Sequence, residues 1–151
     1  MPRASYKRLK VWRRAMDLVE AVYVLTRKFP AEEKSGLTAT LRRTAAALPA
    51  KIADGRGRMN AKVTPQSLAA TRASLLELTA YFDVAQRLRM GSSWRLSTAR
   101  RRAKKLRAAL EQKLRAMPVE GPAGPPAKES KLTLKQPVPP ANEPVPLRKA
   151  A

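Results

Sequence analysis

The chain has 151 residues, with 32 basic and 11 acidic side chains, and its formal net charge at pH 7 is +21. It contains neither cysteine nor histidine, which excludes disulfide bonds, Ser-His-Asp triads, Cys-His dyads and the usual Cys/His zinc sites. We therefore expect a non-enzymatic protein without metal or cofactor, whose excess positive charge favours an anionic partner.

The sequence contains no run of about 18 or more apolar residues that would cross a bilayer, and its N-terminus lacks an apolar signal stretch. These features predict a cytoplasmic protein with no membrane association. The length fits one domain with one core.

The first predicted helix covers residues 9–28. Apolar side chains recur there at the i, i+3, i+4, i+7 spacing of an amphipathic helix. Proline disfavours the helical conformation in the residue before it, so Phe29-Pro30 should end this helix. The predicted buried face comprises Trp12, Ala15, Met16, Val19, Val22, Tyr23 and Thr26.

The second predicted helix covers residues 34–54. Pro49 lies inside it and removes a backbone hydrogen bond, so we expect a kink there. Gly55 follows Asp54 and predicts the end of the helix. The predicted buried face comprises Leu37, Leu41, Ala45, Leu48 and Ile52.

The third and fourth predicted helices cover residues 65–90 and 93–117. Thr64-Pro65 is typical of an N-cap followed by proline in the first turn, and Gly91-Ser92-Ser93 predicts a helix stop and a new cap. The predicted buried face of the third helix comprises Leu68, Leu75, Leu78, Phe82, Ala85 and Leu88. That of the fourth comprises Leu96, Ala99, Ala103, Leu106, Leu110 and Met117.

Nine of the 13 prolines lie in residues 118–151, which predicts a disordered, proline-rich C-terminal tail. Residues 1–117 hold 27 basic and 8 acidic side chains, a net +19, so the charge belongs mainly to the helical part. Four helices with short connections predict an all-α fold, an antiparallel up-down-up-down four-helix bundle.

The order of residues 6–58 is more specific than amphipathicity requires. Three stretches carry a resemblance: Tyr6-Lys-Arg-Leu-Lys-Val-Trp-Arg-Arg-Ala15, Glu33-Lys-Ser-Gly-Leu37-Thr38, and Leu48-Pro-Ala-Lys-Ile-Ala-Asp-Gly-Arg-Gly-Arg58. Together they strongly resemble the four-helix-bundle protein family encoded in 23S rRNA intervening sequences. The likeness continues more loosely through Ala73-Ser-Leu-Leu-Glu-Leu78 and does not reach the tail.

The resemblance implies a left-handed four-helix bundle that often assembles as a ring-shaped homopentamer. It also implies distant kinship to accessory variability proteins of diversity-generating retroelements, which bind RNA and a reverse transcriptase. This sequence departs from the family pattern where Lys51 replaces an asparagine and Ala73 replaces a glycine. Its fourth helix is basic, whereas that of relatives is often acidic.

The most concentrated basic segment is residues 100–107. A helical wheel places Arg100, Arg101, Lys104 and Lys105 on the outer face of the fourth helix, with Arg107 at its flank. Glu111 can pair with Arg107 or Arg115 at the i, i+4 spacing. A phosphate-binding surface and a merely solvated helix face explain this segment equally well.

A second basic cluster opens the first helix, where the helix dipole is already positive, so cations there favour a bound anion. It comprises Lys7, Arg8, Lys10, Arg13 and Arg14.

Further candidate phosphate ligands are Arg42 and Arg43 in the second helix and Arg56 and Arg58 after it. For Arg42 and Arg43 a structural role is the stronger interpretation. We expect them to form salt bridges with Glu77, Asp83 or Asp17.

Trp12 is expected in the core and Trp94 at the boundary of the fourth helix, so few aromatic side chains remain for base stacking. Nucleic-acid binding should then rest on phosphate contacts, depend on salt and show little sequence preference.

The leading functional hypothesis is a homo-oligomer that binds nucleic acid, RNA rather than DNA. The second is a scaffold or adaptor whose proline-rich tail recruits a protein. A role on anionic lipid surfaces is weaker, because the apolar stripe of the fourth helix is needed for the core. Lysine-based catalysis is the weakest hypothesis.

Overall fold

The computed structural model describes residues 6–57, except the side chains of 55–57, and residues 63–118. Two short 3₁₀ helices and four α-helices make up the regular structure of these ranges: η1 (Tyr6–Arg8), α1 (Lys10–Thr26), η2 (Ala31–Glu33), α2 (Leu37–Gly57), α3 (Pro65–Arg87) and α4 (Ser93–Arg115). The predicted disordered tail, apart from Pro118, lies outside the described residues.

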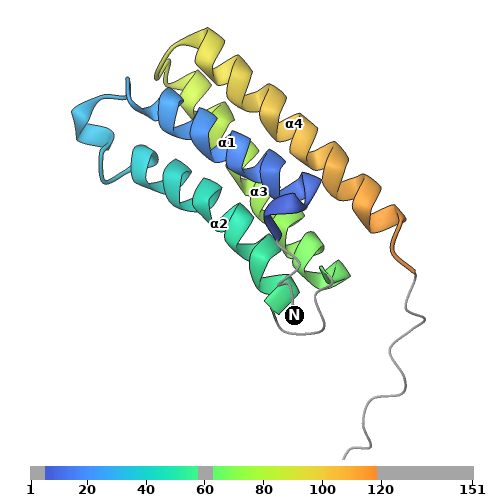
Figure 1. Cartoon of the computed structure of the whole chain (residues 1–151). Coiled ribbons are helices and arrows are strands. Elements are labelled where there is room, and N and C mark those ends of the chain that lie inside the picture. Colours follow the sequence, from blue (N-terminus) through green and yellow to red (C-terminus); the bar gives the residue numbers. More distant parts are fainter. Residues whose placement is uncertain (1–5, 58–62, 119–151) are drawn as a thin grey trace, which may run out of the picture. The chain divides into compact units, whose positions relative to one another are not determined.

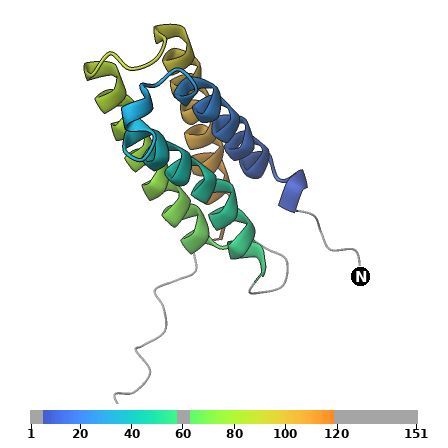
Figure 2. The ribbon, with the colours of Figure 1, turned by 90° about the vertical axis from the view of Figure 1, so that its left-hand side faces the viewer.

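The four α-helices form an antiparallel bundle with up-down-up-down connections (Figure 1). Helix α1 packs against α2 and α4, and α3 packs against the same two helices, so α1 and α3 are diagonal to each other (Figure 2). The start of α1 therefore lies at the same end of the bundle as the end of α4. The predicted fold class is confirmed.

The core is one continuous cluster to which all four helices contribute large side chains. Most of the predicted buried faces of the second, third and fourth helices are found in it. The largest fully buried side chains include Leu18, Leu25, Leu41, Leu48, Ile52, Leu68, Leu78, Phe82, Leu106 and Leu110.

The predicted buried face of α1 is partly wrong. Met16 and Tyr23 are each 41% exposed, whereas Leu18 and Leu25 are fully buried. Trp12 is half-buried, packs against the core and meets Tyr6 edge to face, with ring centroids 5.4 Å apart. Helix α1 is apolar over more than half of its circumference, so it has two stripes that could face a core.

Helix α2 starts and ends three residues later than predicted, and it continues through Pro49. Gly55 does not end the helix, which reaches Gly57. Glycine costs only about 1 kcal/mol relative to alanine inside a helix, so a single glycine is a weak stop signal.

The predicted N-cap of α3 is confirmed, since the Ser67 amide donates to Thr64 Oγ1 over 3.1 Å. Gly91 has a φ of +71°, the left-handed conformation that glycine supplies between two helices. Ser92 occupies the N-cap position of α4, but its side chain makes no capping bond. Leu88 is 57% exposed rather than buried, because α3 ends at Arg87.

Candidate nucleic-acid interface

The outer face of α4 carries Arg101, Lys104 and Lys105, which we call the α4 cationic face. All three side chains are exposed. No ion pair joins any of them to another residue in the described part of the chain. Helix α4 buries the opposite face in the core, so these cations are held in water on a rigid element.

Arg100 and Arg107, predicted as part of the same surface, are instead neutralised by neighbouring acids. Arg100 Nη2 lies 2.6 Å from Asp83 Oδ1 of α3, and Arg107 Nε lies 3.1 Å from Glu111 Oε1. The predicted pairing of Glu111 is thereby confirmed for Arg107. Both pairs are solvent-accessible, so a phosphate can compete with the carboxylates for these guanidinium groups.

Arg102 lies on the side of α4 that faces α1 and joins these two helices. Its Nη1 donates to the Asp17 carbonyl oxygen over 2.6 Å and approaches Glu20 Oε2 at 3.4 Å. Arg102 thus uses its charge to hold two helices together. The basic segment 100–107 therefore divides into cations that are free in water, cations paired with acids and one interhelical tie.

A groove of about 750 Å³ runs between α3 and α4 beside the α4 cationic face. Arg72 of α3 and Lys104 of α4 stand on opposite walls, and Leu76 on the α3 wall is 70% exposed. Nothing in the sequence around Arg72 marks it as a candidate site residue. Ala73 is exposed in this groove and does not lie at a close helix contact.

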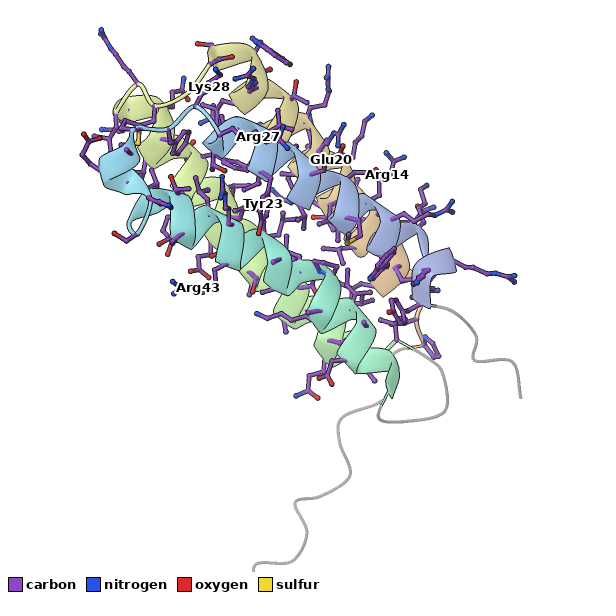
Figure 3. All side chains as sticks on the ribbon, turned by 60° about the vertical axis from the view of Figure 1, so that its left-hand side comes forward. Arg14, Glu20, Tyr23, Arg27, Lys28 and Arg43 are labelled. Atoms are coloured by element: carbon purple, nitrogen blue, oxygen red, sulfur yellow. The ribbon has the colours of Figure 1, made fainter. Side chains whose placement is uncertain are left out.

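The basic cluster at the start of α1 lies at the same end of the bundle as the last turn of α4, since α1 and α4 are antiparallel neighbours (Figure 1). Arg14 is half-buried, and Figure 3 shows it on the side of α1 away from α2. The first turn of α1 contains no acid, and its N-cap residue makes no side-chain bond, so the cluster meets an uncompensated helix dipole. The exposed members are Lys7, Arg8, Lys10 and Arg13.

Lys113 and Arg115 in the last turn of α4 extend this end of the bundle with two more exposed cations. They were not predicted as site residues, because they lie beyond the dense basic run of residues 100–107. Only the antiparallel packing of α1 and α4 brings these two positions and the start of α1 to one end.

Arg42 and Arg43 lie on α2, which does not contact α4. Arg42 Nε donates to Thr26 Oγ1 over 2.9 Å, and its guanidinium lies 4.8 Å from the centroid of the Tyr23 ring. The structural role predicted for Arg42 is found, but its partners are a hydroxyl and an aromatic ring instead of a carboxylate. Arg43 is exposed at the outer edge of α2 (Figure 3).

Lys51 of α2 donates to Ser74 Oγ and so joins α2 to α3. It is half-buried and serves packing in this chain. The side chain of Arg56 and all of Arg58 lie outside the described residues, and the predicted clasp at these two arginines stays a prediction.

The fold and these surfaces define a small, strongly cationic four-helix bundle. The chain belongs to the 23S rRNA-intervening sequence protein family, whose family model matches residues 7–112. A search of curated proteins finds no match. Within the described ranges, no helix is long and apolar enough to traverse a lipid bilayer.

Proposed function

We propose that this protein is a non-catalytic homo-oligomer that binds nucleic acid, RNA in preference to DNA, through phosphate contacts of the α4 cationic face. The observation that carries the proposal is that Arg101, Lys104 and Lys105 are exposed and unpaired within the described residues. Neighbouring arginines on the same helix, Arg100 and Arg107, are paired with acids.

The contrast between paired and unpaired cations supports a binding role. None of the three cations is paired with an acid within the described residues, so three like charges repel one another within about one turn of the helix. A phosphate backbone relieves this repulsion and releases its own counterions on binding. The net charge of +21 adds long-range attraction for a polyanion.

One consideration favours RNA. The family is named for intervening sequences of 23S rRNA, which associates its members with an RNA context. The α4 cationic face offers lysine and arginine side chains that can bind phosphates. Contacts of this kind bind the backbone with little sequence preference.

The proposal is tested by titrating labelled RNA and duplex DNA with protein at about 50 mM salt, where phosphate contacts contribute strongly. The double variant Arg101→Gln/Lys105→Gln should bind RNA more weakly by on the order of tenfold for each lost contact. The matched control is Lys28→Gln/Lys34→Gln, which removes the same charge from exposed positions at the α1–α2 connection. Equal affinities of the two variants would refute the assignment to α4.

Self-association is supported by an exposed apolar stripe on α1. Met16 and Tyr23 are each 41% exposed, and half-buried Val19 lies between them on the same face. Beside this stripe, α2 presents the exposed small side chains of Ala46 and Ala50. Such a surface loses its contact with water when a second copy covers it.

Light scattering of the purified protein should give a mass of several protomers. Met16→Glu should lower that mass, because it places a charge in the apolar contact. A monomeric wild-type protein at all concentrations would contradict the oligomer but leave the nucleic-acid proposal to be judged by its own titration.

The same stripe supports the alternative function, a scaffold that binds another protein and no nucleic acid. Under this alternative the Arg101→Gln/Lys105→Gln variant keeps its partner, whereas Met16→Glu loses it. The predicted recruiting segment in the proline-rich tail lies outside the described residues.

A further inference from the structure

Trp94 in the first turn of α4 is 64% exposed, an unusual position for so large an apolar side chain. It makes no contribution to the core, in contrast to the half-buried Trp12. Its place at the start of α4 is the boundary position that the sequence predicts. An indole held in water on a rigid helix is a surface for stacking.

Trp94 lies in register with the α4 cationic face. Arg101 follows it by seven residues and Lys105 by eleven, which correspond to about two and three turns, so the three side chains point to one side of α4. At about 1.5 Å per residue, Arg101 lies about 10 Å beyond Trp94 along the helix axis and Lys105 about 6 Å further. One aromatic ring and two cations thus form a line on one face.

The pocket beside Trp94 is lined by two arginines, Arg95 and Arg102, and by one acid, Glu20 of α1. The guanidinium carbon of Arg95 lies 5.3 Å from the centroid of the indole ring. The first turn of α4 contains no acidic residue. A positive charge beside an accessible aromatic ring suits a ligand that has both a flat ring and an anion, as a nucleotide does.

We propose that Trp94 stacks on an unpaired base while Arg101 and Lys105 bind phosphates of the same strand, which makes single-stranded RNA the ligand class of this face. The inference rests on the proposed function and adds to it. Bases of a duplex are covered by their neighbours and cannot stack on an indole, whereas an unpaired base offers its face. The proposal predicts that single strands are preferred over duplexes of equal length.

Tryptophan fluorescence gives a direct readout. An unstructured RNA oligonucleotide should quench the emission of the wild-type protein, and Trp94→Phe, which retains Trp12, should show little quenching. Trp94→Ala should bind the strand about tenfold more weakly, and Trp94→Phe should recover most of that loss because a phenyl ring also stacks. The control Val84→Ala, which trims another exposed apolar side chain on α3, should bind like the wild type.

An RNA strand whose nucleotides lack their bases separates base stacking from phosphate binding. The wild-type protein should bind it about as weakly as Trp94→Ala binds the intact strand. Equal wild-type affinity for the intact and the abasic strand would overturn the inference and leave the proposed function standing. If no RNA binds the wild type at all, the proposed function fails and the inference fails with it.

A second possible role for Trp94 is a contact between protein copies. In that case Trp94→Ala would lower the mass measured by light scattering and leave the affinity for the single strand unchanged. This result would also overturn the inference. Thermal unfolding of Trp94→Ala should be close to that of the wild type, because the side chain is largely exposed and lies outside the core cluster.

Discussion

Replacing Thr26 by valine tests the contact that fixes Arg42 between α1 and α2. The Thr26 side chain is buried, its hydroxyl donates to the Val22 carbonyl oxygen, and it accepts from Arg42 Nε, both over 2.9 Å. Valine keeps the shape and removes the acceptor. A hydrogen bond to a charged group contributes about 1.5–3 kcal/mol.

Arg42 is half-buried, so water can replace part of this bond, and we expect Thr26→Val to lower the free energy of unfolding by about 1–2 kcal/mol. For a domain of about 100 residues this corresponds to a fall in Tm of roughly 4–12 °C. Urea unfolding followed by circular dichroism measures the difference directly.

The control is Thr40→Val, whose hydroxyl donates to the Gly36 carbonyl oxygen over 3.1 Å at an exposed position. This change should cost less than about 0.5 kcal/mol. A double-mutant cycle of Thr26→Val with Arg42→Ala should give a coupling of about 1 kcal/mol. If Thr26→Val is no more destabilising than Thr40→Val, Arg42 does not hold the two helices, and its proposed structural role is refuted.

Three further predictions concern single residues. Gly91→Ala should destabilise the protein by about 1–3 kcal/mol, because φ is +71° and the new Cβ would lie 2.9 Å from Phe29 Cε1; unchanged urea unfolding would contradict this. The hydrogen bond from Tyr81 to Glu77, and then the charge of Glu77, raise the pKa of Tyr81 above 10.0. The contribution of this contact to stability is therefore complete below pH 10 and is lost as the pH rises through the raised pKa. Ultraviolet titration should show Glu77→Gln lowering that pKa towards its ordinary value, and identical titrations would refute the contact. Arg102→Ala should lower the free energy of unfolding by less than about 1 kcal/mol, since the ion pair of Arg102 with Glu20 is partly exposed. A loss above about 3 kcal/mol would contradict the assignment of this pair as a surface salt bridge.

The number and order of the helices could be predicted because their signals are local. Thr64 precedes a proline, and Gly91 follows a periodic apolar segment, so neighbouring residues predict both the start and the end of the third helix. The end of α2 could not be predicted in the same way. Gly55 tolerates helical geometry, and the helix continues to Gly57.

The buried face of α1 was misassigned because its sequence supports two apolar stripes. Leu18 and Leu25 belong to one, and Met16 and Tyr23 to the other, and both have helical spacing. Only the positions of α2 and α4 decide which stripe is covered. The choice depends on tertiary packing, which no single helix encodes.

The cations of the candidate site could be predicted from the sequence, but not which of them are paired with acids. Helical spacing alone placed Glu111 within reach of Arg107, and the two are in contact. By contrast, Asp83 reaches Arg100 from a neighbouring helix 17 residues away. Such contacts decide which cations remain available to phosphate, and they depend on the order of helices around the bundle.

The central claim is that the α4 cationic face binds the phosphates of RNA, and the salt dependence of the affinity tests it most directly. The logarithm of the binding constant should fall linearly with the logarithm of the salt concentration. For Arg101→Gln/Lys105→Gln the slope should be shallower by about 1.4 per bound protomer, because each single-strand phosphate contact contributes about 0.7. A double variant with the slope and affinity of the wild type would contradict the account.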